Sequence, residues 1–152
     1  MSSDQEHSER RARIVQGIVD ETGVNEEMIV NLVHTFYGKV RTDPLIGPIF
    51  ERVIEDWDPH LAKMCDFWSS VMLMSGRYKG NPMIAHMRLK MVRPEHFERW
   101  LELFTETAAE VCPAAAAEAF VGRANNIARS LQLGMFYRAE KYPPPQARQD
   151  AP

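Results

Sequence analysis

Residues 57–73 read WDPHLAKMCDFWSSVML, and this stretch decides the fold class. The pair Asp58-Pro59 is typical of a helix start, because a carboxylate can cap free backbone N–H groups and proline fits the first helical turn. Behind it, one histidine and five apolar side chains recur at helical spacing. These are His60, Met64, Phe67, Trp68, Val71 and Met72. The stretch therefore predicts a long amphipathic helix with an aromatic face.

The rest of the chain repeats this pattern with other start and stop signals. Asn25 is a candidate N-cap before an apolar stripe over residues 29–40. Asn81-Pro82 opens a shorter helix, and Pro94 opens a longer one that Pro113 stops. A last stripe covers residues 120–135. No stretch alternates apolar and polar residues as a strand would, so the sequence predicts a compact all-α fold whose helices cross at large angles.

Composition excludes several classes of function. The chain has 152 residues, 18 basic and 21 acidic, with a net charge of −3, so it lacks the basic footprint of a nucleic-acid-binding protein. There is no apolar run of membrane-spanning length, and the charged start lacks the apolar centre of a signal peptide. Two cysteines form no metal-binding or disulfide pattern. We expect a cytoplasmic protein that binds neither nucleic acid nor membrane.

The positions of glycine and proline divide the chain into three regions. Residues 1–24 are expected to form an N-terminal extension with a short helix, either packed on the domain or serving as a dimer contact. Residues 25–142 form the predicted domain. Residues 143–152 are rich in proline and predict a disordered tail.

Two histidines stand out among the five. His60 and His86 each lie on the apolar face of a helix, shortly after a proline start, whereas the other three have polar or charged neighbours. A histidine in this position is either a hydrogen-bonded core residue or a ligand. Tyr37 and Trp100 carry polar tips on apolar stripes, and such tips need partners when buried. The residues alone leave both readings open: an ordinary core, or convergence on a small bound ligand.

The chain resembles the truncated haemoglobins, most closely their third group, over residues 29–138. The resemblance is carried by LVHTFYGKVRTDPLIGPIF (32–50), WDPHLAKMCDFWSSVML (57–73), YKGNPMIAHMRL (78–89) and HFERWLELF (96–104). It implies a globin-like helical sandwich of the two-over-two type, and the N-terminal helical extension lies outside the matched part. It also implies one haem b.

The resemblance assigns roles to individual residues. His86 matches the proximal histidine that binds iron, and Tyr37 matches the distal tyrosine that donates a hydrogen bond to the ligand. His60 matches the distal histidine, and it could donate to the ligand, act as a gate or bind iron itself. Trp100 matches the tryptophan at the back of the distal pocket. The other implied haem contacts are Phe36, Phe50, Met64 and Phe67. No motif identifies the partners of the propionates, and Tyr78 and Arg93 are candidates by their position in the chain.

The function implied by the resemblance is reversible binding of small diatomic ligands, oxygen first and also NO and CO. Tyr37, His60 and Trp100 would then be the candidate catalytic residues for NO dioxygenation or peroxidase-like chemistry, which needs an external electron-donating reductase. A haem-based sensor without turnover and a helical module without haem are the alternatives. We expect a monomer or a weak homodimer.

Overall fold

The computed structural model describes residues 3–137, which form seven α-helices and a final π-helical turn. The elements are α1 (Ser3–Thr22), α2 (Glu26–Thr42), α3 (Gly47–Val53), α4 (Trp57–Leu73), α5 (Pro82–Met87), α6 (Pro94–Val111), α7 (Ala114–Gln132) and η1 (Leu133–Tyr137). There is no strand within the described residues. The all-α prediction is confirmed. The predicted tail, 143–152, and the end of the predicted domain, 138–142, lie outside the described residues.

The helix starts follow the capping signals of the sequence. The side chain of Asn25 accepts a hydrogen bond from the Met28 N–H at 2.8 Å, and α6 begins at Pro94, as predicted. The start of α4 needs a correction. Its N-cap is Asp56, whose carboxylate accepts from the Asp58 N–H at 3.3 Å, so Asp58 lies inside the first turn. Asp56 also precedes an apolar residue, and this second acidic start was overlooked.

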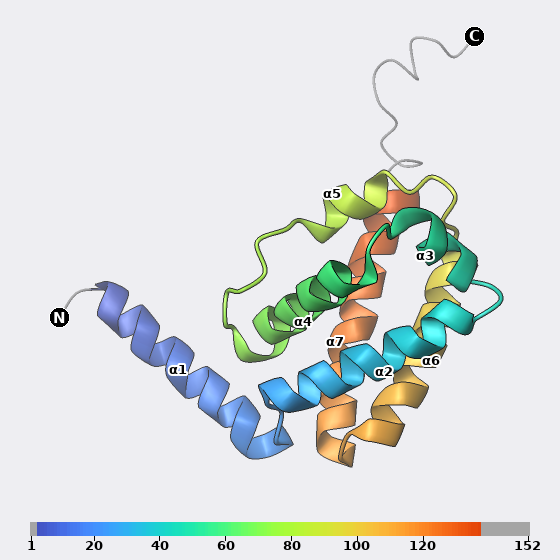
Figure 1. Cartoon of the computed structure of the whole chain (residues 1–152). Helices are drawn as coiled ribbons and strands as arrows, with labels where there is room; N and C mark the ends of the chain where they lie inside the picture. Colours follow the sequence, from blue (N-terminus) through green and yellow to red (C-terminus); the bar gives the residue numbers. More distant parts are fainter. Residues whose placement is uncertain (1–2, 138–152) are drawn as a thin grey trace, which may run out of the picture.

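Two helix pairs build the body of the molecule (Figure 1). Helix α2 packs on α4, and α6 packs on α7, while the contact between α2 and α6 joins the two pairs. This is the expected two-over-two helical sandwich. A close backbone contact defines the turn after α2. A Cβ on Gly47 would lie only 3.0 Å from the carbonyl oxygen of Val40. Glycine therefore lets α3 turn tightly against the end of α2.

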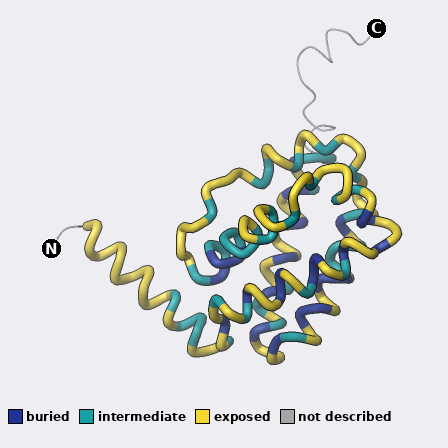
Figure 2. The backbone as a smooth tube through the Cα atoms, in the orientation of Figure 1, coloured by how far each residue is buried: buried dark blue, intermediate teal, exposed yellow. Residues whose placement is uncertain are grey.

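The N-terminal extension, expected as a short helix, is the 20-residue helix α1. Its first half stands away from the body and is exposed along its length (Figures 1 and 2). Its second half contacts α4 and α7. Gly23, at φ +74°, turns the chain back into α2 in a left-handed conformation that glycine adopts without strain.

Aromatic rings form the centre of the core. Phe104 of α6 stacks on Trp100 of the same helix at 5.3 Å and on Trp68 of α4 at 5.0 Å between ring centroids. Phe36 of α2 meets Phe104 edge-on at 5.2 Å, and Phe120 of α7 meets Trp68 at 5.9 Å. Four helices thus meet in one set of rings, which fixes how the two pairs cross. No helix among residues 3–137 is both long and apolar enough to cross a membrane.

Candidate functional site

Helix α5 holds His86 in one defined orientation. The helix begins because the Asn81 side chain accepts from the Ile84 N–H at 3.2 Å and Pro82 occupies the first turn. One turn later, His86 Nδ1 lies 2.7 Å from the Pro82 carbonyl oxygen. A carbonyl oxygen only accepts hydrogen bonds, so Nδ1 carries a proton, and in the neutral imidazole Nε2 is then the nitrogen with the lone pair. The half-buried imidazole therefore presents Nε2 as a ready ligand atom.

Helix α2 buries Tyr37 among rings. The side chain is 5% exposed, and its ring lies 4.9 Å from Phe36 and 5.8 Å from Phe50 between centroids. Burial strongly raises the pKa of the Tyr37 hydroxyl, and a hydrogen bond with the Trp100 side chain lowers it only in part. The phenol is therefore protonated throughout the physiological range and is available as a donor.

His60, in the first turn of α4, carries a buried nitrogen without a partner. Its ring lies 5.4 Å from Tyr37, nearly perpendicular to it. Among the described residues, its Nε2 is the one buried side-chain nitrogen or oxygen that makes no hydrogen bond. Burial, together with the nearby charge of Lys63, lowers the pKa of His60, so the imidazole is neutral at pH 7. Buried polar atoms are nearly always satisfied, so this nitrogen is left to pair with a group from outside the chain.

Trp57 completes this group, although the sequence reasoning did not name it as a site residue. Its ring lies 5.6 Å from His60, 6.0 Å from Tyr37 and 6.3 Å from Phe50. The guanidinium of Arg41 covers the Trp57 ring at 4.6 Å. The available signal was spacing, because Trp57 precedes His60 by three residues and so shares its helix face.

One turn of helix α6 contacts both the group around Tyr37 and His60 and the ring of His86. Trp100 contacts Phe36 edge-on at 5.4 Å and hydrogen-bonds with Tyr37. Phe97, one turn earlier, faces the His86 ring at 6.4 Å. The sequence analysis did not name Phe97 as a site residue. Leu101, the residue after Trp100, packs against both the main core and the smaller cluster around Phe97.

The structure brings some expected residues together and leaves others apart. Phe36, Tyr37, Phe50, His60 and Trp100 form one connected group. Met64 and Phe67 are half-buried farther along α4, where they pack on the core, and Phe67 meets Tyr78 at 5.2 Å. Arg93 is exposed at the start of α6, where its backbone N–H donates to His96 Nδ1 at 2.9 Å.

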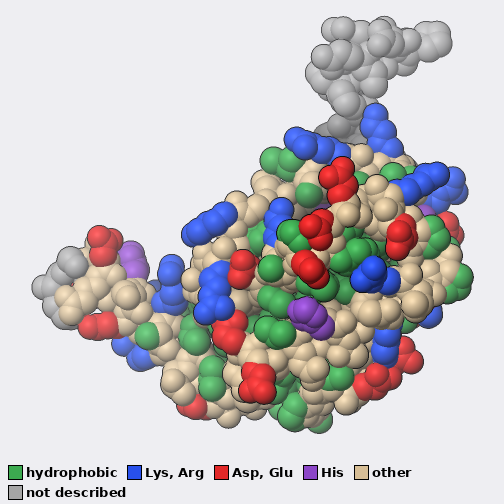
Figure 3. All heavy atoms as spheres, in the orientation of Figure 1, with side chains coloured by type: hydrophobic (Ala, Val, Ile, Leu, Met, Phe, Trp, Pro, Cys, Tyr) green, Lys and Arg blue, Asp and Glu red, His purple; other side chains and the backbone are tan. Residues whose placement is uncertain are grey.

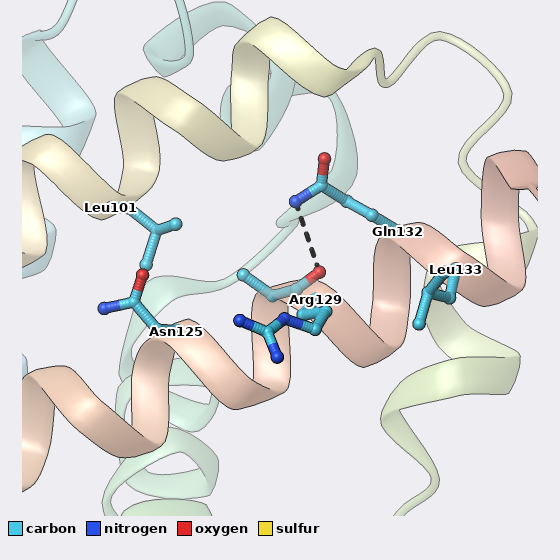
Figure 4. A pocket seen from close by; sticks show the side chains of 6 residues that line it. Leu101, Asn125, Arg129, Gln132 and Leu133 are labelled. Carbon is cyan, nitrogen blue, oxygen red and sulfur yellow. Dashed lines mark hydrogen bonds between the residues drawn. The ribbon is translucent and has the colours of Figure 1, made fainter.

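Two hollows lie on the surface near these elements. The larger one, about 540 Å³, is lined by Pro59, Ala62, Lys63, Asp66, Arg77, Tyr78, Lys79 and Gly80. It adjoins the helix of His60. The smaller one, about 280 Å³, lies between α6 and α7, where the amide of Gln132 folds back to the Ala128 carbonyl at 3.3 Å (Figure 4). It includes Leu101 but none of the predicted site residues.

Comparison with known proteins decides the family. A family model described as "Bacterial-like globin" matches residues 17–132. The chain belongs to the bacterial-like globins. This globin is 38% identical over 119 residues to the group 3 truncated haemoglobin of Campylobacter jejuni, covering 76% of this chain and 93% of that protein. The crystal structure of a group III truncated haemoglobin from Campylobacter jejuni matches with a TM-score of 0.71 and 37% identity, over 74% of this chain and 92% of that one. The resemblance to group III truncated haemoglobins is thereby confirmed.

Membership in this family implies haem and a small gas ligand. The residues of this globin fit such a group in two respects. His86 offers a bare Nε2 whose opposite nitrogen is held by a carbonyl, the usual arrangement of a metal-ligating histidine. His60 offers a buried, unpartnered nitrogen within an aromatic cage, where a ligand atom would satisfy it. Within residues 3–137 no three His, Cys, Asp or Glu side chains converge as a metal site.

Proposed function

We propose that this globin binds one haem b through His86 Nε2 and reversibly binds diatomic ligands, oxygen first, beside Tyr37, His60 and Trp100. The observation that carries the proposal is the 2.7 Å hydrogen bond from His86 Nδ1–H to the Pro82 carbonyl. It fixes the tautomer and the ring orientation that iron ligation requires, and it raises the basicity of the ligating nitrogen.

The proposed roles of the chain follow from what each residue can donate. When bound, haem b supplies an iron that takes up oxygen, NO or CO and can support oxidation of NO to nitrate with one electron from an external donor. Tyr37, kept protonated by burial, donates its O–H to the ligand. Trp100 hydrogen-bonds with Tyr37 and so orients the hydroxyl. Neutral His60 donates from its unpartnered nitrogen as a secondary partner or gate.

The remaining assignments concern the walls and the edge of the cofactor. Phe36 and Phe50 would form the wall of the haem pocket beside Tyr37, and Met64 and Phe67 would extend this wall along α4. Tyr78 and Arg93 are proposed at the propionates. Burial raises the pKa of the Tyr78 hydroxyl, so it remains a hydrogen-bond donor, and exposed Arg93 offers a cation.

The test of the proposal is ligation at His86. The purified protein should show a Soret band, and H86G should lose or shift it. Added imidazole should restore it, because the free ligand fills the gap left by the side chain. H34A is the matched control, since His34 is exposed on α2 and should leave the spectrum unchanged. A wild-type Soret band that H86G leaves intact would refute ligation by His86.

A further inference from the structure

A long stretch without any carboxylate surrounds His86 in the sequence. Between Asp66 and Glu95 the chain contains no Asp or Glu, although it has 21 acidic residues in all. The same stretch contains five cations: Arg77, Lys79, Arg88, Lys90 and Arg93. Arg77 forms a salt bridge with Glu26 at 3.1 Å, and none of the other four forms one within residues 3–137. The segment is therefore strongly positive on a chain that is negative overall.

Exposed apolar side chains lie between these cations. Ile84 is 52% exposed, Met87 57% and Met91 40%, all on α5 or in the turn that follows it. Leu133, on η1, is 51% exposed, and η1 contacts α5. Hydrophobic and basic side chains lie side by side at the upper edge of the molecule, where α5 runs, with an acidic side chain just below them (Figures 1 and 3). Single exposed apolar residues are ordinary, but a group with a cationic surround is typical of an interaction surface.

We propose that Ile84, Met87, Arg88, Lys90 and Met91, here called the basic face, dock an acidic protein that carries single electrons. Charge selects the partner, because opposite charge speeds encounter and excludes partners of the same sign. A small apolar centre with a charged rim fits the brief contacts of electron-transfer proteins, which bury little area. Met87 and Arg88 directly follow His86, so the docked partner would lie close to the proximal side of the site.

This inference rests on the proposed function, because it needs an iron held by His86 that must be returned to the ferrous state. In that step one electron leaves the reduced partner and converts ferric iron to ferrous iron. The partner is oxidised by one electron, and no bond forms or breaks. The sequence contains no nucleotide- or flavin-binding motif, so the proposal takes the electron from a donor outside this chain.

The kinetic test uses a reduced plant-type [2Fe–2S] ferredoxin, an acidic one-electron carrier, mixed rapidly with the ferric holoprotein. The variant R88E/K90E reverses two charges of the basic face, and R10E/R11E makes the same charge change on exposed α1. The second-order rate of reduction should fall at least tenfold in R88E/K90E and less than twofold in R10E/R11E. The wild-type rate should fall steeply with salt. Equal effects of the two variants would overturn the proposal, because net charge alone would then explain them.

Two further measurements separate this inference from the proposed function. Dithionite, a small reductant, should reduce wild type and R88E/K90E at equal rates, and a large difference would mean that the variant damages the site itself. Calorimetric titration with oxidised ferredoxin should show salt-dependent binding that R88E/K90E abolishes, whether or not the iron reacts with oxygen. Absence of binding at low salt would overturn the inference, even if the Soret test succeeds. Self-association through this face, abolished by M87D, would also overturn it.

Discussion

The hydroxyl of Tyr37 gives the sharpest test of the proposed site. The change Y37F removes one oxygen atom and keeps the ring, which is 5% exposed and packs on Phe36, Phe50, Trp57 and His60. The fold should therefore survive. A hydrogen bond to an acceptor that carries charge contributes about 1–3 kcal/mol. Since about 1.4 kcal/mol corresponds to tenfold, the oxygen dissociation rate should rise about 5- to 150-fold.

The assay for Y37F is stopped-flow displacement of oxygen by excess CO. Oxygen takes up more negative charge on binding than CO does, so the CO dissociation rate should change much less and serves as an internal control. Thermal unfolding of wild type and variant checks that the packing is intact. An oxygen dissociation rate within twofold of wild type would refute the role of the Tyr37 hydroxyl. An equal rise for both ligands would show that the site had loosened as a whole.

Three further predictions concern pH and stability. Burial lowers the pKa of His60 in the folded protein below the ordinary value of about 6.5, which the unfolded chain retains. As pH falls below about 6.5, the unfolded chain therefore binds more protons at His60 than the folded protein does, and the free energy of unfolding should fall. Denaturant titrations should show that H60Q loses this component. F120A removes a fully buried ring and should cost about 3–5 kcal/mol in urea unfolding. Asp43 accepts hydrogen bonds from the Ile46 N–H at 3.1 Å and the Arg99 guanidinium at 2.9 Å, and D43A should cost about 1–3 kcal/mol.

The controls for these predictions lie in the same experiments. For Asp43, burial alone would raise the pKa, but the hydrogen bonds outweigh it and the net pKa is lowered. Its contribution to stability is therefore present above the ordinary aspartate value and is lost as pH falls through the lower folded value. A D43A variant with an unchanged acid transition contradicts this reading. An unchanged pH profile in H60Q, or a loss below 1 kcal/mol in F120A, contradicts the other two.

The fold was predictable because its signals are local. Asn25, Pro94 and Pro113 mark helix ends through capping and backbone chemistry, which neighbouring residues determine. The error at Asp58 arose because Asp56 offers the same cap two residues earlier, and only packing decides between them. The π-helical turn after Gln132 has no comparable signal in the apolar stripe.

The site was less predictable because it depends on contacts between distant helices. The residues alone indicated that His60 and His86 were unusual, but they did not show that one has an unpartnered nitrogen and the other a carbonyl partner. Trp57 and Phe97 were missed as site residues because their importance comes from the rings of other helices. Periodicity shows which face of a helix is buried, but it does not show which neighbour that face meets.

The spacing between Phe97 and Trp100 constrains how this chain can change. Successive residues of an α-helix are rotated by about 100° around its axis. A one-residue insertion or deletion between these two positions would therefore swing one ring away from its histidine or tyrosine while the other stayed in place. Substitutions can accumulate along this turn, but its length is fixed because Phe97 must face His86 while Trp100 contacts Tyr37.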